Sequence, residues 1–522
     1  MKQFKVADRQ RQKKGRRQAK AKEKSPTGKG KRRVADRQRK KLKYFELIYN
    51  KLFTFIHKFS KMDFQEFLSY SNLDSKVYQK EGVDWCLSRE QQPNPETTIR
   101  GGIIADEMGL GKTIMMIATI VCNFKMPTLI VLPNVLIEQW KEQFQLTTGH
   151  TPLIYHGQVK KIITAEYLQN IPIILTTYGT VLADANKEKK LQQVQWNRII
   201  CDEAHHLRNR RTKIAKVVTT SLQTNIMWLI TGTPIQNHIN DLFSLFDILR
   251  IPNKVYTDVD KLKNIINTLV LRRTKADVGI QLPALSITRI DTEWTNQKEQ
   301  QLAEDIHDKL SFSLLKQKPL EHTLRLSTML CARMLCVYPK MATKYLHKLK
   351  KMGYLTDANF DGLKQSSKMD SVVNTIISRK TNGNRKIIFT NFKDEIDHIK
   401  RVLISNGLLV EYIDGRVSSK QKRQEILTNK IDVLILQIKT GNEGLNLQQY
   451  NEVYFVTPDW NPKIEEQAIA RCYRLGQQKE VHVFRFIMNH FNKENSRTIN
   501  IEQYTETVQI DKIEIGDKAL CI

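Results

Sequence analysis

Long apolar runs are missing from this 522-residue sequence. The longest, such as IPIIL at 171–175 and VLIL at 433–436, fall far short of the roughly 18 residues that a membrane-spanning helix needs. The basic N-terminus is followed by no apolar segment, so nothing resembles a secretory signal. We therefore expect no membrane partner and a place on the reducing side of the membrane.

Cysteine is also scarce, with seven residues scattered along the chain. The only close pair, Cys331 and Cys336, lacks the CxxC spacing of a zinc site, so we expect no structural zinc. Each cysteine is expected to be a buried apolar side chain.

Acidic residues are too few to balance the basic ones, with 54 Asp and Glu against 84 Lys and Arg, a net charge of +30. Residues 1–43 alone hold 20 basic and three acidic side chains and repeat VADRQR at 6–11 and 34–39. With few large apolar residues, this tail is predicted to be disordered. It is either a solubilising tail or, as we favour given the motifs downstream, a phosphate-binding arm or nuclear address built on KKGRR (13–17) and KGKRR (29–33).

Two series of short β-branched runs follow a predicted helical lead-in at 44–72, where apolar residues from Tyr44 to Ser69 recur at helical spacing. The first series, in a lobe at 73–290, contains IRGGII (99–104), TLIVLP (128–133), IPIILTTY (171–178), NRIICDEAH (197–205) and NIMWLITGTP (225–234). The second, in a lobe at 366–490, contains RKIIFTNF (385–392), LLVEYIDG (408–415), DVLILQ (432–437), EVYFVTPD (452–459) and VHVFRFI (481–487). Continuous apolar strands that alternate with helices predict an α/β fold with two parallel-sheet lobes.

The rest of the chain is less regular. Residues 291–365, rich in Leu, Lys and Met, predict a helical insertion between the lobes. The C-terminal extension at 491–522 is polar, apart from VQIDKIEI at 508–515, which fits a late strand or a helix. Trp140, Trp196 and Trp228 adjoin apolar runs and are expected in the core.

A glycine loop between the first strand and a helix predicts a phosphate site. IRGGIIAD is followed by Glu107-Met108-Gly109-Leu110-Gly111-Lys112-Thr113 and the apolar run 114–120. Backbone N–H groups and the positive helix end can then hold a polyphosphate, Lys112 can reach its phosphates and Thr113 can ligate Mg²⁺. The strict phosphate-loop pattern is not met, because Asp106 stands where the first Gly is expected.

Asp202-Glu203-Ala204-His205 ends a buried strand about 90 residues later. Asp202 can hold Mg²⁺ through water, and Glu203 can orient or deprotonate the attacking water. Two adjacent carboxylates repel each other unless a metal offsets their charge. Together the two motifs predict a nucleoside triphosphatase with ATP and Mg²⁺ as cofactors.

Several motifs in order resemble the Swi/Snf-like DNA-dependent ATPases of helicase superfamily two. They are DEMGLGKT (106–113), DEAH (202–205), LITGTPIQN (229–237), LRRTKADV (271–278) and QAIARCYRLGQ (467–477). The resemblance covers about residues 73–487 and implies two RecA-like lobes with ATP in the cleft between them.

Matched to the family's motifs, Gln79 resembles an adenine-reading glutamine, and Gly109, Gly111, Lys112 and Thr113 resemble the phosphate and Mg²⁺ site. Asp202 and Glu203 resemble the metal and water residues, and His205 and Thr231 to Thr233 resemble elements that couple nucleotide to DNA. Arg471 and Arg474 resemble arginine fingers. If residues 467–474 form a helix, Gln467, Arg471 and Arg474 share one face of it.

The segments 132–134, 176–178, 390–392 and 439–446 resemble the family's DNA-gripping motifs. Contacts of this kind to the DNA backbone carry no sequence information, as a translocase requires. The sequence departs from the family at Thr440-Gly441-Asn442-Glu443, where Ala-Gly-Gly is common.

The resemblance implies an ATP-driven translocase on double-stranded DNA that remodels or displaces bound protein, such as nucleosomes, polymerases or repair factors, in the nucleus or a viral replication compartment. A strand-separating helicase and a nucleotide-dependent DNA-binding scaffold are the alternatives. The first needs a wedge that we do not identify, and the second has no need of both Glu203 and the arginines.

Overall fold

The computed structural model describes residues 62–92, 96–97, 99–310, 322–353, 355, 360, 362–363, 366–417, 420–438, 445–491 and 498–520. The chain divides into two units, Met1–Asp63 with Val121–Phe124 and Phe64–Ile120 with Lys125–Ile522, and the second unit contains both sheets. The basic tail at 1–43 and most of the helix expected from Tyr44 lie outside the described residues. Within those ranges, every helix is too short or too polar to cross a membrane.

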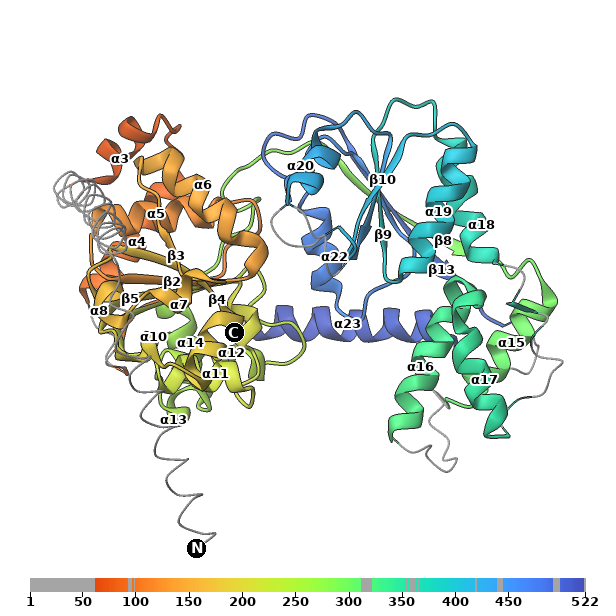
Figure 1. Ribbon diagram of the computed structural model, residues 1–522, viewed down its shortest axis with the longest axis horizontal. Helices are drawn as coiled ribbons and strands as arrows, with labels where there is room; N and C mark the ends of the chain where they lie inside the picture. Colours follow the sequence, from red (N-terminus) through yellow and green to blue (C-terminus); the bar gives the residue numbers. More distant parts are fainter. Residues whose placement is uncertain are drawn as a thin grey trace, which may run out of the picture. The chain divides into compact units, whose positions relative to one another are not determined.

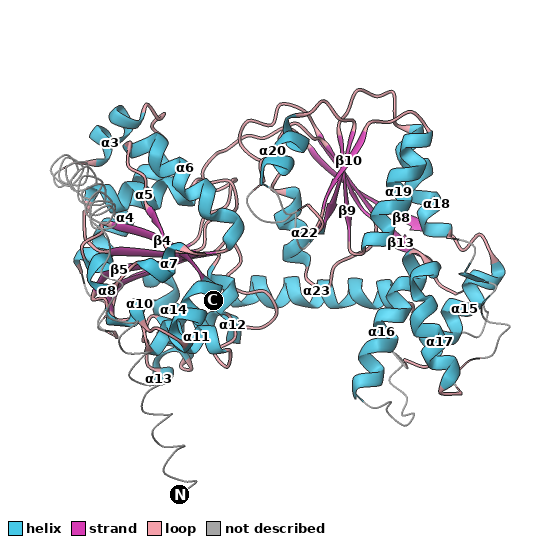
Figure 2. Cartoon of the chain, in the orientation of Figure 1, coloured by secondary structure: helices cyan, strands magenta, loops and turns pink. Residues whose placement is uncertain are grey.

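The first lobe is built on a seven-stranded sheet whose paired strands all run parallel. In spatial order its strands are β3 (Leu153–Ile154), β4 (Ile173–Thr177), β2 (Thr128–Leu132), β5 (Trp196–Asp202), β6 (Thr224–Ile230), β1 (Arg100–Ile104) and β7 (Val270–Leu271). All five predicted strands form, and helices lie on both sides of the sheet (Figures 1 and 2). These helices are α3 (Phe64–Ser71), α4 (Val77–Gln91), α5 (Lys112–Cys122), α6 (Ile137–Thr148), α7 (Val159–Ile162), α8 (Ala165–Gln169), α9 (Tyr178–Asn186), α10 (Lys190–Gln193), α11 (Lys213–Thr220), α12 (Asn240–Ile248), α13 (Asn253–Tyr256) and α14 (Val259–Leu269).

The second lobe has a six-stranded sheet, also parallel at every pair. Its order is β10 (Val410–Ile413), β11 (Val433–Gln437), β9 (Lys386–Thr390), β12 (Glu452–Phe455), β13 (Val481–Met488) and β8 (Leu285–Thr292). Figure 1 shows α20 (Lys420–Thr428) and α22 (Pro462–Ile469) on one side and α18 (Ser367–Ser378) and α19 (Lys393–Ser405) on the other. The α/β class predicted from the apolar runs is thereby confirmed.

Neighbouring residues of these strands are buried in two separate cores. Ile387 and Leu434 pack with Ile426 and Ala468 from α20 and α22, whereas Ile388 packs on the opposite face with the helices α18 and α19. A strand that is covered on both faces has no polar side, which is why these segments appear in the sequence as continuous apolar runs.

At the start of β12, the carboxylate of Glu452 is fully buried. It accepts hydrogen bonds from the Arg379 Nη2 (2.7 Å), Asn382 Nδ2 (2.6 Å), Asn384 Nδ2 (3.1 Å) and Tyr454 hydroxyl (2.6 Å) groups. A buried carboxylate satisfied by so many donors fixes the positions of the strands and turns that supply them.

The boundary between the lobes differs from the expectation at residue 290. The strand β8 pairs with β13 along its whole length, so residues 285–290 belong to the second sheet. Helices α15 (Gln297–Asp308), α16 (His322–Val337) and α17 (Thr343–Lys351) follow, in the region expected to be a helical insertion. The segment 508–515 is helical, within α23 (Ile501–Leu520).

The cysteines behave as small apolar side chains where the structure describes them. Cys86, Cys201, Cys331, Cys336 and Cys472 are buried, and Cys122 is partly buried, whereas Cys521 lies outside the described residues. Burial raises the pKa of the Cys201 thiol to about 12, so the thiol stays protonated near neutral pH.

Candidate active site

The loop between β1 and α5 has the backbone of a phosphate-binding turn. Gly109 (φ +93°) and Gly111 (φ +82°) adopt left-handed conformations that a side chain would strain. The Nζ atom of Lys112 donates to the carbonyl oxygens of Asp106 (2.7 Å) and Glu107 (3.2 Å), so its ammonium lies inside the loop. Thr113 follows in the first turn of α5, where backbone N–H groups are free to bind an anion.

Burial lowers the pKa of Lys112, and the charges of Glu203, Asp106 and Asp202 act in the opposite direction. The lysine thus shares one electrostatic environment with the carboxylates of the second motif. A cation held in that environment is suited to phosphate oxygens.

Asp106, which replaces the expected glycine, is fully buried and ion-paired. Arg273 grips it with two hydrogen bonds, from Nε to Oδ1 (3.1 Å) and from Nη2 to Oδ2 (2.6 Å). Lys275, two residues on, pairs with the Glu107 carboxylate. The segment LRRTKADV therefore holds the start of the phosphate loop, a role that no local pattern in the sequence indicates.

Gln79 lies against the other side of this loop. It is 7% exposed, and its Nε2 donates to the carbonyl of Leu110 (3.3 Å). A Cβ atom added to Gly111 would clash with the same nitrogen. The sequence-predicted glutamine and glycine therefore meet in space.

Asp202, the last residue of β5, is held by two donors. Its Oδ2 accepts from Trp140 Nε1 (2.7 Å), and its Oδ1 accepts from the backbone N–H of Glu203 (2.9 Å). Burial and the neighbouring Glu203 charge raise the pKa of Asp202. The prediction that the three tryptophans are buried is confirmed for Trp140, Trp196 and Trp228. The sequence did not predict that Trp140 donates to Asp202, because the two residues lie 62 positions apart and no local pattern reveals their contact.

Glu203 sits in a strained, left-handed backbone position (φ 49°, ψ 50°) directly after the end of β5. Burial alone would raise its pKa, but His205, Arg471 and Lys112 outweigh burial and lower it. His205 Nδ1 lies 3.2 Å from Glu203 Oε2. The glutamate is therefore ionised.

Arg471 and Arg474 lie beyond the end of their helix. The expectation that Gln467, Arg471 and Arg474 share a helix face is wrong for the two arginines, because α22 ends at Ile469 and turns follow. Their chain nevertheless reaches the first lobe, since a Cβ atom built on Gly109 would lie 3.6 Å from Arg474 Cβ. The Nε atom of Arg474 is buried with no hydrogen-bond partner among the described residues.

The segment Thr231 to Thr233 also borders the loop. A Cβ atom on Gly232 would lie 3.1 Å from Met108 Cγ and 3.6 Å from Lys112 Nζ. Gln236 Nε2 donates to Thr233 Oγ1 (3.1 Å), and Gln236 Oε1 accepts from Asn461 Nδ2 (3.3 Å) at the start of α22. This gives a hydrogen-bonded route from the loop to the helix that precedes the arginines.

The segments that resemble DNA-gripping motifs occupy equivalent places in the sheets. Residues 132–134, 176–178 and 390–392 begin at or before the carboxyl ends of β2, β4 and β9, where parallel sheets place their ligands. Tyr178 links one of them to the carboxylates, because its hydroxyl donates to the Asp202 carbonyl (2.7 Å). Of residues 439–446, only Leu445 and Asn446 are described.

These groups fit a magnesium nucleotide. The two left-handed glycines leave the loop open to phosphate oxygens, and the orphaned Arg474 Nε is a donor that an anion would satisfy. Thr113 and Asp202 supply the hard oxygen ligands that Mg²⁺ prefers.

The sequence matches two domain families. Residues 78–341 match the SNF2-related domain, and residues 367–476 match the helicase conserved C-terminal domain. Chromodomain-helicase-DNA-binding protein 6 from Mus musculus is 31% identical over 461 residues, which cover 79% of this chain and 16% of that protein. Chromodomain-helicase-DNA-binding protein 8 from Homo sapiens is 29% identical over 463 residues, covering 79% of this chain and 17% of the relative.

The chain thus spans about a sixth of the length of these relatives. Among solved structures, the Sulfolobus solfataricus SWI2/SNF2 ATPase core in complex with dsDNA aligns with 24% identity and a TM-score of 0.37, covering 85% of this chain and 96% of that one. The first domain match alone spans half of the chain. The chain therefore belongs to the Swi/Snf-like family, defined by the SNF2-related domain.

Proposed function

We propose that this chain is an ATP-driven motor that translocates on double-stranded DNA and remodels or displaces DNA-bound protein. The observation that carries the proposal is the meeting of two segments at one loop. The first lobe supplies the loop residue Lys112 and the neighbouring carboxylates of Asp202 and Glu203. The second lobe supplies Arg474, which approaches the loop at Gly109. Such an arrangement makes hydrolysis depend on both lobes.

In this proposal, the first lobe binds ATP. The loop N–H groups and Lys112 hold the phosphates. Gln79, which contacts the loop at Leu110, is assigned to read the base. Thr113 and Asp202 hold Mg²⁺, which when bound neutralises charge on the phosphate oxygens.

Glu203 orients the attacking water and accepts its proton. Its depressed pKa keeps it charged near neutral pH, because His205 and Arg471 favour the ionised form. Arg471 and Arg474 supply positive charge to the phosphates as the transition state forms, a contribution of about 10³-fold or more in related phosphoryl transfers.

Double-stranded DNA is proposed as the partner because the relatives bear the name chromodomain-helicase-DNA-binding protein and the aligned SWI2/SNF2 core was solved with dsDNA. The displaced protein would be of the nucleosome or polymerase class, with the nucleus or a viral replication compartment as the location. The basic tail at 1–43 stays a predicted phosphate-binding arm or nuclear address, and it lies outside the described residues.

The test is steady-state ATP hydrolysis without nucleic acid, with single-stranded DNA and with blunt duplex, for the wild type and Lys112→Ala. Strong stimulation by duplex that Lys112→Ala abolishes is expected. Preference for single strands would favour a strand-separating helicase. No stimulated turnover would overturn the motor and leave a nucleotide-dependent scaffold.

A further inference from the structure

The two arginines need a support other than a helix. Cys472 and Tyr473 bond to the carbonyl of Ile469, and the segment then continues in turns to Gly476, so no regular hydrogen-bond ladder fixes Arg471 and Arg474. We define residues 470–479 as the arginine segment. What holds it must be sought in side chains.

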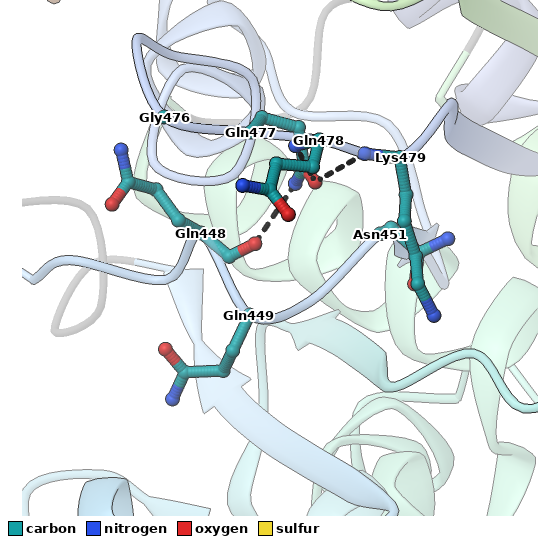
Figure 3. A pocket seen from close by; sticks show the side chains of 7 residues that line it. All are labelled: Gln448, Gln449, Asn451, Gly476, Gln477, Gln478 and Lys479. Carbon is teal, nitrogen blue, oxygen red and sulfur yellow. Dashed lines mark hydrogen bonds between the residues drawn. The ribbon is translucent and has the colours of Figure 1, made fainter.

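Gln477 supplies that support. Its side chain is 8% exposed, and Figure 3 shows it directed from the arginine segment toward Gln448 of the loop at 447–451. Its Nε2 lies within hydrogen-bond distance of the carbonyl oxygens of Gln448 (2.9 Å), Tyr450 (3.2 Å) and Cys472 (3.2 Å). Because an amide has two hydrogens, the three acceptors share them.

The other end of the same amide is also fully used. Gln477 Oε1 accepts from the backbone N–H groups of Gln478 (2.9 Å) and Lys479 (3.0 Å). The backbone N–H of Gln477 itself donates to the carbonyl of Arg474 (3.0 Å). One side chain therefore closes the turn behind Arg474 and joins it to a second loop.

The neighbouring contacts repeat this connection. The N–H of Leu447 donates to the Arg471 carbonyl (3.1 Å), and Gln448 Nε2 donates to the Leu475 carbonyl. Gly476 is left-handed (φ +95°), and a Cβ atom there would lie 2.9 Å from Gln448 Nε2. The loop at 447–451 is thus hydrogen-bonded to the backbone of Arg471 and to that of Leu475, the residue after Arg474.

We propose that Gln477 is a positioning residue for Arg471 and Arg474, and that it holds them through the loop at 447–451. This inference rests on the proposed ATPase. In the sequence, the loop directly follows residues 439–446, which resemble a DNA-gripping motif.

The test compares Gln477→Glu with Gln478→Glu. The first keeps the shape and the acceptor atoms but sets carboxylate oxygen against three carbonyls, whereas the second makes the same chemical change on an exposed neighbour. We expect kcat to fall by about 30-fold in Gln477→Glu, as arginine positioning is lost in part, with the KM for ATP changed less than about threefold. Gln478→Glu should match the wild type.

A double-variant comparison separates positioning from general stability. In a background that carries both Arg471→Ala and Arg474→Ala, Gln477→Glu should lower kcat by less than about threefold, because both groups it positions are gone. If the two losses multiply, or if Gln477→Glu equals Gln478→Glu, the inference is overturned.

Gln448→Ala is a milder variant for use if Gln477→Glu fails to fold. It removes one side-chain bond to the Leu475 carbonyl, and kcat should fall about fivefold. An unchanged kcat there would also contradict the proposal. A wild type without any ATP hydrolysis would instead overturn the proposed function, so the two failures are distinguishable.

Discussion

The phosphate loop and the arginine segment are held by opposite means. Asp106 and Glu107 of the loop are fixed by the charged side chains of Arg273 and Lys275. The arginine segment is fixed by the neutral amides of Gln477 and Gln448. The carboxylates of the preceding helix are engaged elsewhere, Glu465 with Arg485 and Glu466 with Lys463.

The difference has an electrostatic reason. A carboxylate used to hold the arginine segment would neutralise the guanidinium groups that it positioned. Amide groups fix the backbone and leave the positive charge available for phosphate. The loop can use ion pairs, because its phosphate-binding groups other than Lys112 are backbone N–H groups and the paired carboxylates face Arg273 and Lys275.

Removing the charge of Glu203 should have the largest effect on this arrangement. We expect Glu203→Gln to lower kcat by about 10⁴-fold, because the water loses its proton acceptor, while ATP binding measured by equilibrium titration is kept. By contrast, Lys112→Ala should lose ATP binding as well as ATP hydrolysis. A Glu203→Gln protein with substantial turnover would contradict the role given to this residue.

In the arginine segment, Arg474→Ala should lower kcat by about 10³-fold. The thermal midpoint should change little, since the Nε atom of Arg474 has no protein partner among the described residues. Lys479→Ala, an exposed basic residue of the same segment, is the matched control and should leave kcat unchanged. Equal losses in both variants would point to a general effect of charge.

Asp106→Gly restores the usual phosphate-loop pattern but leaves Arg273 without its buried partner. We expect a loss of about 3 kcal/mol in the free energy of unfolding, measured by urea denaturation. Replacing both charges, as in Asp106→Leu with Arg273→Met, should recover part of that loss. If Asp106→Gly is as stable as the wild type, the ion pair does not hold the loop.

The smallest effect is expected at the tryptophan behind Asp202. Trp140→Phe removes the N–H donor, and the Mg²⁺ concentration needed for half-maximal ATP hydrolysis should rise about tenfold. Trp196→Phe is the control, because its buried Nε1 donates to the Leu191 carbonyl, which belongs to no part of the site. An equal Mg²⁺ requirement in both variants would leave Trp140 with a packing role only.

The sequence predicted those parts of the fold whose signal is local. All ten apolar runs became strands, because burial on both faces leaves a continuous pattern. The strand β8 was missed, since most of its side chains are exposed and no apolar run marks it. The short strands β3 and β7 contain two residues each and carry no pattern at all.

The same division applies to the site. Lys112 and Asp202 follow strands in recognisable motifs, so the sequence could predict that these two side chains lie near each other. The contacts of Arg273 with Asp106 span 167 residues, and only the fold reveals them. The prediction that Arg471 and Arg474 lie on a helix was wrong, because residue spacing alone cannot show that α22 ends at Ile469.

The two-sided burial of the second sheet has a consequence for how its strands find their places. A one-residue slip normally moves an apolar set to the wrong face, but here both faces are apolar, so burial alone does not oppose the slip. The hydrogen bonds of Glu452 supply that opposition, since a shifted β12 would separate this carboxylate from Arg379, Asn382 and Asn384. The alignment of β12 in this sheet is thereby supported by one charged residue at the start of the strand.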